Sequence, residues 1–284
     1  MKNYAENRKT RLVKYAQEQD FVEKGIVGGN FQGKESQWKN LILITNKTNR
    51  KSIIEKYNLL NGLKFDSDYY RLHTYAHHLS SSQILCYNFF RPLINERHPN
   101  KELCQIFTNQ GITISEKANC QFEYGGYKLF PNEGTEYDFH IMDCNFNTEI
   151  FIEVKYTEDC FASAKKDEKH REKFKKVYKN MITSCACLKN KEIEEEEFLN
   201  NYQLFRNVLR ITDKSKYTVF IFPKENEELL NEYNQFEETY INEQYANNVK
   251  AWYWEDLMKG KEESKFFRKY FQPIKTIAQD EKGK

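Results

Sequence analysis

Charged residues stand inside two strand-like runs, rich in Phe, Ile and Val, of the stretch TEYDFHIMDCNFNTEIFIEVKYTE (135–158). Asp138 lies in one run rich in Phe and Ile, and Glu153 and Lys155 lie in the next such run. Ionised side chains are rarely tolerated among apolar neighbours unless they are paired or bind a metal. Two carboxylates beside a lysine are groups that can bind a divalent cation and act on a phosphate. The stretch therefore indicates a charged site built into a folded core.

Three segments around this site have the short apolar pattern of β-strands: 121–127, 136–143 and 149–157. CNFNTE, between the last two, contains Asn and Thr and suits a hairpin loop. Side chains alternate along a strand, so each segment has one apolar face and one face that carries charge. The charged faces hold these residues: Glu123 in the first strand, Asp138 and His140 in the second, Glu153 and Lys155 in the third. Tyr137 is expected on the apolar face of the second strand. If the strands are neighbours, Glu123, Asp138, Glu153 and Lys155 converge.

Converging carboxylates repel each other, and a divalent cation relieves that repulsion. Mg²⁺ in particular prefers one or two carboxylates together with water and phosphate oxygens. A half-solvated sheet whose outer face carries charge is the alternative, and it is favoured for any one of these residues alone. Phe151, Ile152 and Val154 have the character of buried residues, however, so the set as a whole favours a metal site.

The elements that must position the site follow a mixed pattern. A buried helix is predicted from the serines at 80–82 to Pro92, a polar helix over 163–184 and another helix over 191–211. KYTVFIFP (216–223) alternates as a strand, and NVKAWYWEDLM (248–258) reads as a strand that runs into a helix. Strands, helices and strands again predict an α/β (α+β) fold with a mixed central sheet flanked by helices.

Asp138, fourteen intervening residues and then Glu153-Val154-Lys155 at the end of an apolar strand resemble the PD-(D/E)XK nuclease superfamily. Tyr137 stands where the nominal motif of the superfamily has proline. SSQILCYNFFRPL (81–93) and YQLFRNVLR (202–210) resemble the first core helix and a later helix of a restriction-endonuclease-like group of bacterial proteins within it. The resemblance implies a restriction-endonuclease-like core. It covers roughly 75–260, so we divide the chain into an N-terminal elaboration (1–70) and a nuclease domain (71–284).

The resemblance also implies roles for individual residues. Asp138 and Glu153 would hold Mg²⁺, with Mn²⁺ as a substitute, and the Val154 carbonyl would complete the coordination. Lys155 would position the attacking water, and Gln203 would support the site from its helix. Glu123 would be an additional acid, and Ser82 and Gln83 would lie nearby.

The function that follows is metal-dependent hydrolysis of DNA phosphodiester bonds by an endonuclease, in restriction or defence. A nuclease of repair or of mobile elements is one alternative, and a non-catalytic nucleic-acid-binding protein that kept the fold is another. DNA is favoured over RNA as the partner. A homodimer and separately encoded partner subunits are expectations from the resemblance alone.

Composition sets broad limits on these readings. The chain has 284 residues with 44 basic and 42 acidic side chains, so its net charge of +2 argues neither for nor against nucleic acid. No apolar run approaches the length of about 18 residues that a membrane span needs. Seven irregularly spaced cysteines and a polar N-terminus indicate reduced thiols and a cytoplasmic protein.

Three further patterns leave two readings each. The basic run 165–179 is either a solvated helix face or a surface that contacts phosphates. His73 and His77, with His78 beside them, have a spacing that suits zinc on a helix, but ordinary surface or core histidines are favoured. The aromatic run Trp252–Tyr253–Trp254 suits base stacking, although a place in the core is favoured.

Overall fold

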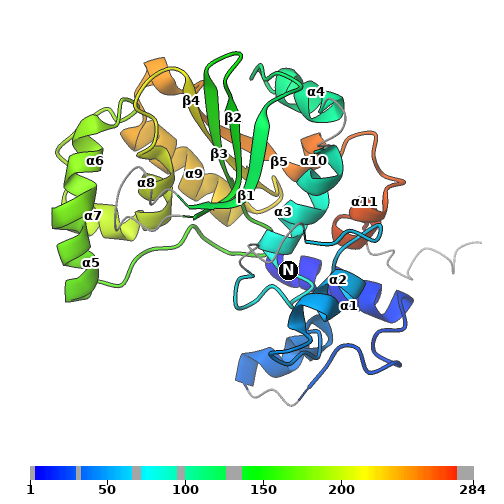
Figure 1. Ribbon diagram of the computed structural model, residues 1–284. Helices are drawn as coiled ribbons and strands as arrows, with labels where there is room; N and C mark the ends of the chain where they lie inside the picture. Colours follow the sequence, from blue (N-terminus) through cyan, green and yellow to red (C-terminus); the bar gives the residue numbers. More distant parts are fainter. Residues whose placement is uncertain (1–3, 30–32, 66–71, 95–99, 126–135, 274–284) are drawn as a thin grey trace, which may run out of the picture.

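The computed structural model describes residues 4–29, 33–65, 72–94, 100–125 and 136–273. Its centre is a five-stranded sheet in the order β1-β2-β3-β4-β5, with helices on both faces (Figure 1). The strands are β1 (Asn119–Gly125), β2 (Glu136–Asp143), β3 (Thr148–Val154), β4 (Lys216–Phe222) and β5 (Val249–Tyr253). The first three pair antiparallel, and β4 and β5 continue the sheet in parallel with β3. The predicted α/β class with a mixed sheet is confirmed.

The β2–β3 hairpin forms where the sequence predicts it. The Asp143 carboxylate accepts the Asn145 N–H at 2.9 Å, and Asn147 takes a left-handed φ of 49°, which asparagine tolerates better than most residues. The hydrogen bond and the left-handed residue both favour a tight turn. The third strand ends earlier than predicted, at Val154, and the last two residues of the predicted strand 121–127 lie outside the described residues.

Helix α3 (Ser82–Phe90) begins where its sequence predicts, because the Ser81 side chain caps the Ile84 N–H. It leads into a 3₁₀ turn (Arg91–Leu93) that contains Pro92. All but the first residue of α3 are buried, and Phe90 stacks on Phe139 of β2 with ring centroids 4.3 Å apart. This contact joins the helix to the sheet within one large apolar core. Helices α4 (Lys101–Asn109), α10 (Trp254–Leu257) and α11 (Lys265–Tyr270) also pack on this core.

A second apolar core covers the opposite face of the sheet. The predicted helix 163–184 begins later, at Glu168, and consists of α5 (Glu168–Lys173), a π-helical turn (Phe174–Tyr178) and α6 (Lys179–Ser184). The predicted helix 191–211 is two helices, α7 (Glu195–Asn200) and α8 (Tyr202–Val208), which meet at Asn201. Helix α9 (Glu227–Tyr240) and a 3₁₀ turn (Glu243–Tyr245) complete this side.

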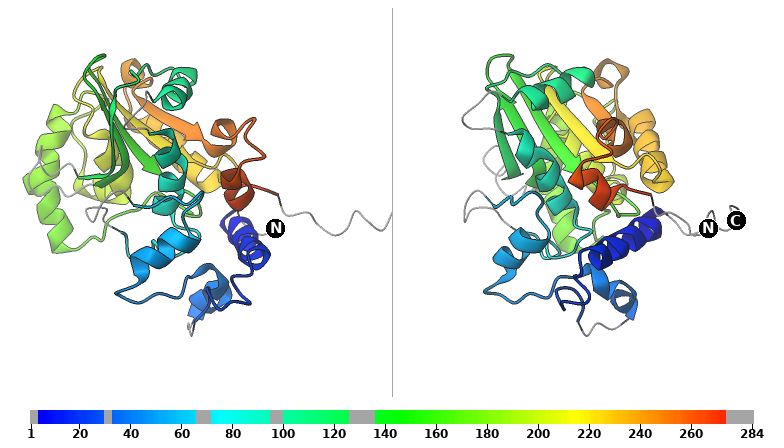
Figure 2. Two further views of the ribbon diagram at one scale, coloured as in Figure 1. Left: turned by 45° about the vertical axis from the view of Figure 1, so that its right-hand side comes forward. Right: turned by 90° about the vertical axis from the view of Figure 1, so that its right-hand side faces the viewer.

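The N-terminal segment packs against the first core. Leu12 of α1 (Tyr4–Glu18) and Ile54 of α2 (Arg50–Tyr57) belong to the same apolar cluster as α3. A kinked 3₁₀ segment (Gly33–Leu41) lies between these two helices along the chain. Helices α1 and α11, from opposite ends of the chain, lie side by side, and Arg11 donates to the Arg268 carbonyl at 2.6 Å (Figure 2).

Neither a membrane helix nor a disulfide is found in the described part of the chain. None of its helices combines the length and the apolar character that crossing a bilayer requires. All seven cysteines lie within the described ranges and are free thiols.

Replacing Phe90 tests the junction between α3 and the sheet. We expect Phe90→Ala to lower the free energy of unfolding by about 3–5 kcal/mol, because it leaves a cavity beside Phe139. Urea denaturation measures the change. Phe146→Ala is the matched control, since its ring is 55% exposed in the β2–β3 turn; its effect should stay within about 0.5 kcal/mol. Equal losses in the two variants would contradict the proposed packing.

Candidate active site

The candidate site begins where backbone pairing between β2 and β3 ends. The last pair is Phe139 with Ile152, and beyond it the Val154 N–H donates to Oδ2 of Asp138 at 2.7 Å. Pairing between β1 and β2 continues past this point to Glu136. The Asp138 carboxylate thus takes the place of a backbone carbonyl as acceptor, and this hydrogen bond holds Asp138 beside the end of β3.

Strand β2 does not keep a simple alternation here. Phe139 and Ile141 lie in the core beneath α3, as predicted. Tyr137 was expected on the same face, but its ring packs on Phe151 at 4.8 Å and its hydroxyl donates to carbonyl oxygens of α8. His140 also packs on Phe151, so Tyr137 and His140 share a face and that expectation was wrong. The change of face falls at Asp138, just beyond the last pair between β2 and β3.

The Glu153 side chain contacts two other residues of the site. Its Oε1 accepts from the Gln203 amide at 2.5 Å and pairs with the Lys155 ammonium at 3.2 Å. The Gln203 amide has one orientation, because its oxygen accepts the Ala162 N–H at 3.0 Å and its NH₂ group therefore faces Glu153. The structure thus brings Glu153, Lys155 and Gln203 into contact.

Lys155 is held by its backbone on both sides. Its N–H donates to the Ile221 carbonyl of β4 at 2.8 Å, and its carbonyl accepts from the indole of Trp254 at 3.1 Å. Burial by itself would lower the pKa of Lys155, but the carboxylates of Glu153 and Glu158 outweigh that effect and raise it. Lys155 therefore carries its positive charge at neutral pH.

Glu123 lies opposite Asp138 in the register of β1 and β2, between the pairs made by Phe122 and Tyr124. Its backbone has a φ of 50°, in the left-handed region that residues with a Cβ seldom adopt. Strain of this kind is concentrated at functional sites. Glu123 lines the same pocket as Asp138, so the structure brings this predicted acid to the site as well.

The electrostatics of Asp138 reflect these neighbours. Burial and then the charges of Glu153 and Glu123 raise its pKa well above the ordinary value, against the opposing effects of the Val154 N–H and Lys155. A buried carboxylate with two acidic neighbours is unfavourable unless a cation or a proton compensates it. The site therefore favours the binding of a cation or a proton.

One pocket of about 690 Å³ holds the whole group. Ser82 and Gln83, at the start of α3, line it as expected. Several other residues of the wall were not predicted as site residues from the sequence: Lys9, His73, Tyr75, His78, Glu136 and Glu158. Glu136 and Glu158 stand two residues before Asp138 and three after Lys155, so proximity along the chain was a usable signal for them. Lys9 and Tyr75 come from segments that no local pattern connects to the strands.

The donors present fit an open Mg²⁺ site. Within the described ranges, Oδ1 of Asp138 and Oε2 of Glu153 accept no hydrogen bond, and both side chains line the pocket. The described residues contain no cluster of three His, Cys, Asp or Glu side chains arranged to enclose a metal. Mg²⁺ needs only one or two carboxylates, since water and phosphate oxygens supply the remaining ligands. The donor set suits Mg²⁺ and not a closed zinc site.

The histidines singled out from the sequence pack against aromatic neighbours. His77 and His78 pack edge to face, and His73 contacts Tyr75. His140 is buried against Tyr124 and pairs with Glu149 at 3.0 Å. Trp252 and Trp254 are core residues, as favoured.

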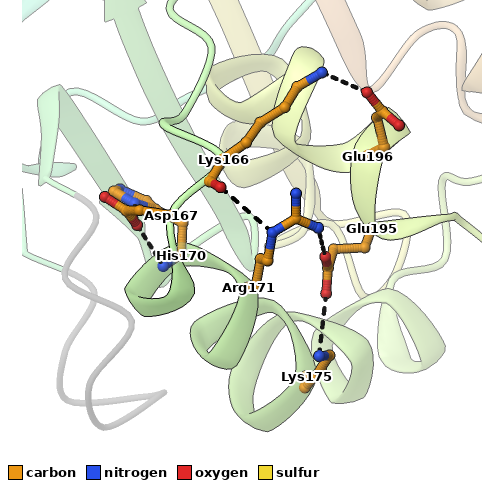
Figure 3. A network of polar contacts seen from close by, with 7 residues as sticks. All are labelled: Lys166, Asp167, His170, Arg171, Lys175, Glu195 and Glu196. Carbon is orange, nitrogen blue, oxygen red and sulfur yellow. Dashed lines mark hydrogen bonds and ion pairs between the residues drawn. The ribbon is translucent and has the colours of Figure 1, made fainter.

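The basic run 165–179 forms ion pairs with the acidic start of α7 (Figure 3). Lys166 pairs with Glu196, while Arg171 and Lys175 both pair with Glu195. These contacts neutralise part of the positive charge and attach α5 to α7. These ion pairs explain why one segment is basic and the other acidic.

Removing the Asp138 charge is expected to stabilise the metal-free protein. The raised pKa means that the folded state binds a proton more readily than the unfolded state, so stability falls as pH rises from about 4 through the folded pKa. Asp138→Asn abolishes this loss. In EDTA, thermal unfolding should show a higher Tm for the variant at pH 8, and the difference should shrink on acidification.

Asp143→Asn is the control on the same strand. Asp143 is buried but accepts hydrogen bonds from the Ser115 hydroxyl and from the backbone N–H groups of Ser115 and Asn145. An amide at this position turns a donor toward donors, so its Tm should fall. A lower Tm for Asp138→Asn as well would mean that Asp138 is a structural carboxylate.

A mixed sheet with two carboxylates, a lysine and a glutamine gathered at the end of its central hairpin defines a protein of the restriction-endonuclease-like fold. The particular family is given by comparison with protein families: residues 9–271 match the family described as Restriction Endonuclease associating with ARP. The chain belongs to this family. Searches of curated proteins and of solved structures found no match.

Proposed function

We propose that the protein is a Mg²⁺-dependent endonuclease that hydrolyses DNA phosphodiester bonds in restriction or defence, with a PD-(D/E)XK active site. The observation that carries this proposal is the contact of the Glu153 carboxylate with both Lys155 and Gln203, beside Asp138 in one pocket. Membership in a restriction endonuclease family supports the nuclease class.

Each residue has a distinct part in the proposed reaction. Asp138 and Glu153 would hold the metal, with the Val154 carbonyl as a third protein ligand; Mn²⁺ would substitute for Mg²⁺. When bound, the metal would supply an acidified water and would polarise the phosphoryl oxygens. Lys155 positions the attacking water and offsets the negative charge that develops on the phosphate.

The remaining groups orient the carboxylates. Gln203 fixes the rotamer of Glu153, because its own amide is fixed by Ala162. The Val154 N–H does the same for Asp138. Glu123 adds negative charge next to Asp138 and so strengthens the attraction for a cation. Such positioning matters for the reaction rate, because small displacements of reacting groups slow catalysis strongly.

Partners follow from the family description and from the chemistry. The description names association with ARP, so we infer that cleavage involves a partner protein as well as DNA. A homodimer would place two sites on the two strands of a duplex. Repair or mobile-element processing is a second setting for the same chemistry. A non-catalytic DNA-binding role is disfavoured by the open carboxylate oxygens at the pocket.

Cleavage with and without Lys155 tests the proposal. Wild-type protein is expected to convert supercoiled plasmid to nicked or linear DNA with Mg²⁺ or Mn²⁺, and EDTA should abolish this. Lys155→Ala should lower the rate by about 100-fold or more, because it removes a charge aimed at the transition state. Gel quantification of the plasmid forms measures the rates.

Lys24→Ala is the matched control, since the exposed Lys24 ammonium forms a surface ion pair with Asp20. Its rate should equal that of the wild type. Equal cutting by the wild type and Lys155→Ala would assign the activity to a contaminant or to another site. Divalent-ion binding that is unaffected by Asp138→Asn would favour the non-catalytic alternative.

A further inference from the structure

An exposed aromatic ring stands in the wall of the pocket that holds the carboxylates. Tyr75 is 54% exposed and lines this pocket together with Asp138, Glu153 and Lys155. An aromatic ring left in water forfeits the free energy of burial. Such a ring beside a candidate active site has a ready use as a contact for a flat, apolar part of the substrate.

The segment that carries Tyr75 is held from two sides. The His73 N–H donates to the Gln83 side chain of α3 at 3.0 Å. On the other side, the Arg50 guanidinium of α2 donates to the carbonyls of His73 and Thr74. These bonds order the backbone before any ligand arrives. Pre-ordering lowers the entropy that binding must overcome.

Two imidazole rings support the tyrosine ring itself. The centroids of His73 and His78 lie 5.6 Å and 5.2 Å from that of Tyr75. Burial, followed by the neighbouring charges of His77 and Arg50, lowers the pKa of His78 to about 4. The ring of His78 is therefore neutral at physiological pH, and it packs as an uncharged aromatic group.

Positive charge stands at the same pocket. Lys9 of α1 lines it, and Lys155 lies at the carboxylates. The wall therefore offers an aromatic ring, cations for a phosphate backbone and a candidate metal site within one cavity of about 690 Å³. Proteins bind unpaired nucleotides with basic groups that contact the backbone and aromatic rings that stack on the bases.

We propose that Tyr75 stacks on an unpaired nucleobase next to the phosphodiester bond held at Asp138 and Glu153. Bases within a duplex have both faces covered by their neighbours, so the preferred substrate carries a base that is unstacked, as in a bulge or a single-stranded stretch. This inference rests on the proposed nuclease function, because it places the nucleotide by the candidate metal site.

The test measures binding without cleavage. Fluorescein-labelled duplexes with one bulged thymidine, or with an abasic bulge at the same place, are titrated with protein in EDTA and followed by anisotropy. The wild-type protein should bind the bulged base about tenfold more tightly than the abasic bulge, as expected for one stacked base. Tyr75→Ala should bind both equally, and Tyr75→Phe should keep the preference.

Phe146→Ala is the control, because Phe146 is about as exposed as Tyr75 but is absent from the pocket wall. It should behave as the wild type. No preference in the wild type, a preference that survives in Tyr75→Ala, or no binding of either duplex would overturn the inference. The result is independent of hydrolysis: a protein that binds in this way but cuts nothing would refute the nuclease proposal alone.

Discussion

The site depends on a backbone N–H group that loses its strand partner. A buried N–H must find an acceptor, and the usual acceptor for a residue at the end of β3 would be a carbonyl of β2. The Asp138 carboxylate takes the Val154 N–H instead. This single bond allows β2 to separate from β3 on the N-terminal side of Phe139 without leaving a buried N–H unpaired. It also fixes a carboxylate next to Glu153, where two negative groups would otherwise move apart.

The two helical layers then position the remaining groups from opposite sides of the sheet. On one side, α8 supplies Gln203 to Glu153 and receives the Tyr137 hydroxyl at its carbonyl oxygens. On the other, Trp254 of α10 donates to the Lys155 carbonyl, and α3 presents its N-terminal residues to the pocket. The lysine and the glutamine can therefore meet the carboxylates only when both cores are packed. The geometry of the candidate site and global folding are coupled for this reason.

Local patterns predicted the elements of this arrangement better than its details. The alternation of Phe139, Ile141, Ile150 and Ile152 predicted the hairpin and its buried face, because each depends only on neighbours along one strand. Tyr137 was placed wrongly, since alternation assumes an unbroken ladder. The break between α7 and α8 at Asn201 was missed because buried apolar residues stand on both sides of it, Phe198 and Leu199 before it and Tyr202 after it. Tyr75 reaches the pocket through tertiary contacts, which no sequence period encodes.

The pocket also shows why the first 70 residues matter to the site. Lys9 of α1 lines the same cavity as Asp138, and α1 is fastened to the far end of the chain through Arg11 and Arg268. Arg50 of α2 holds the segment that carries Tyr75. These contacts span most of the sequence, so this wall of the pocket forms only when the N-terminal helices dock. The strands supply the carboxylates and Lys155 of the candidate site, and the N-terminal segment supplies part of the pocket wall that faces them.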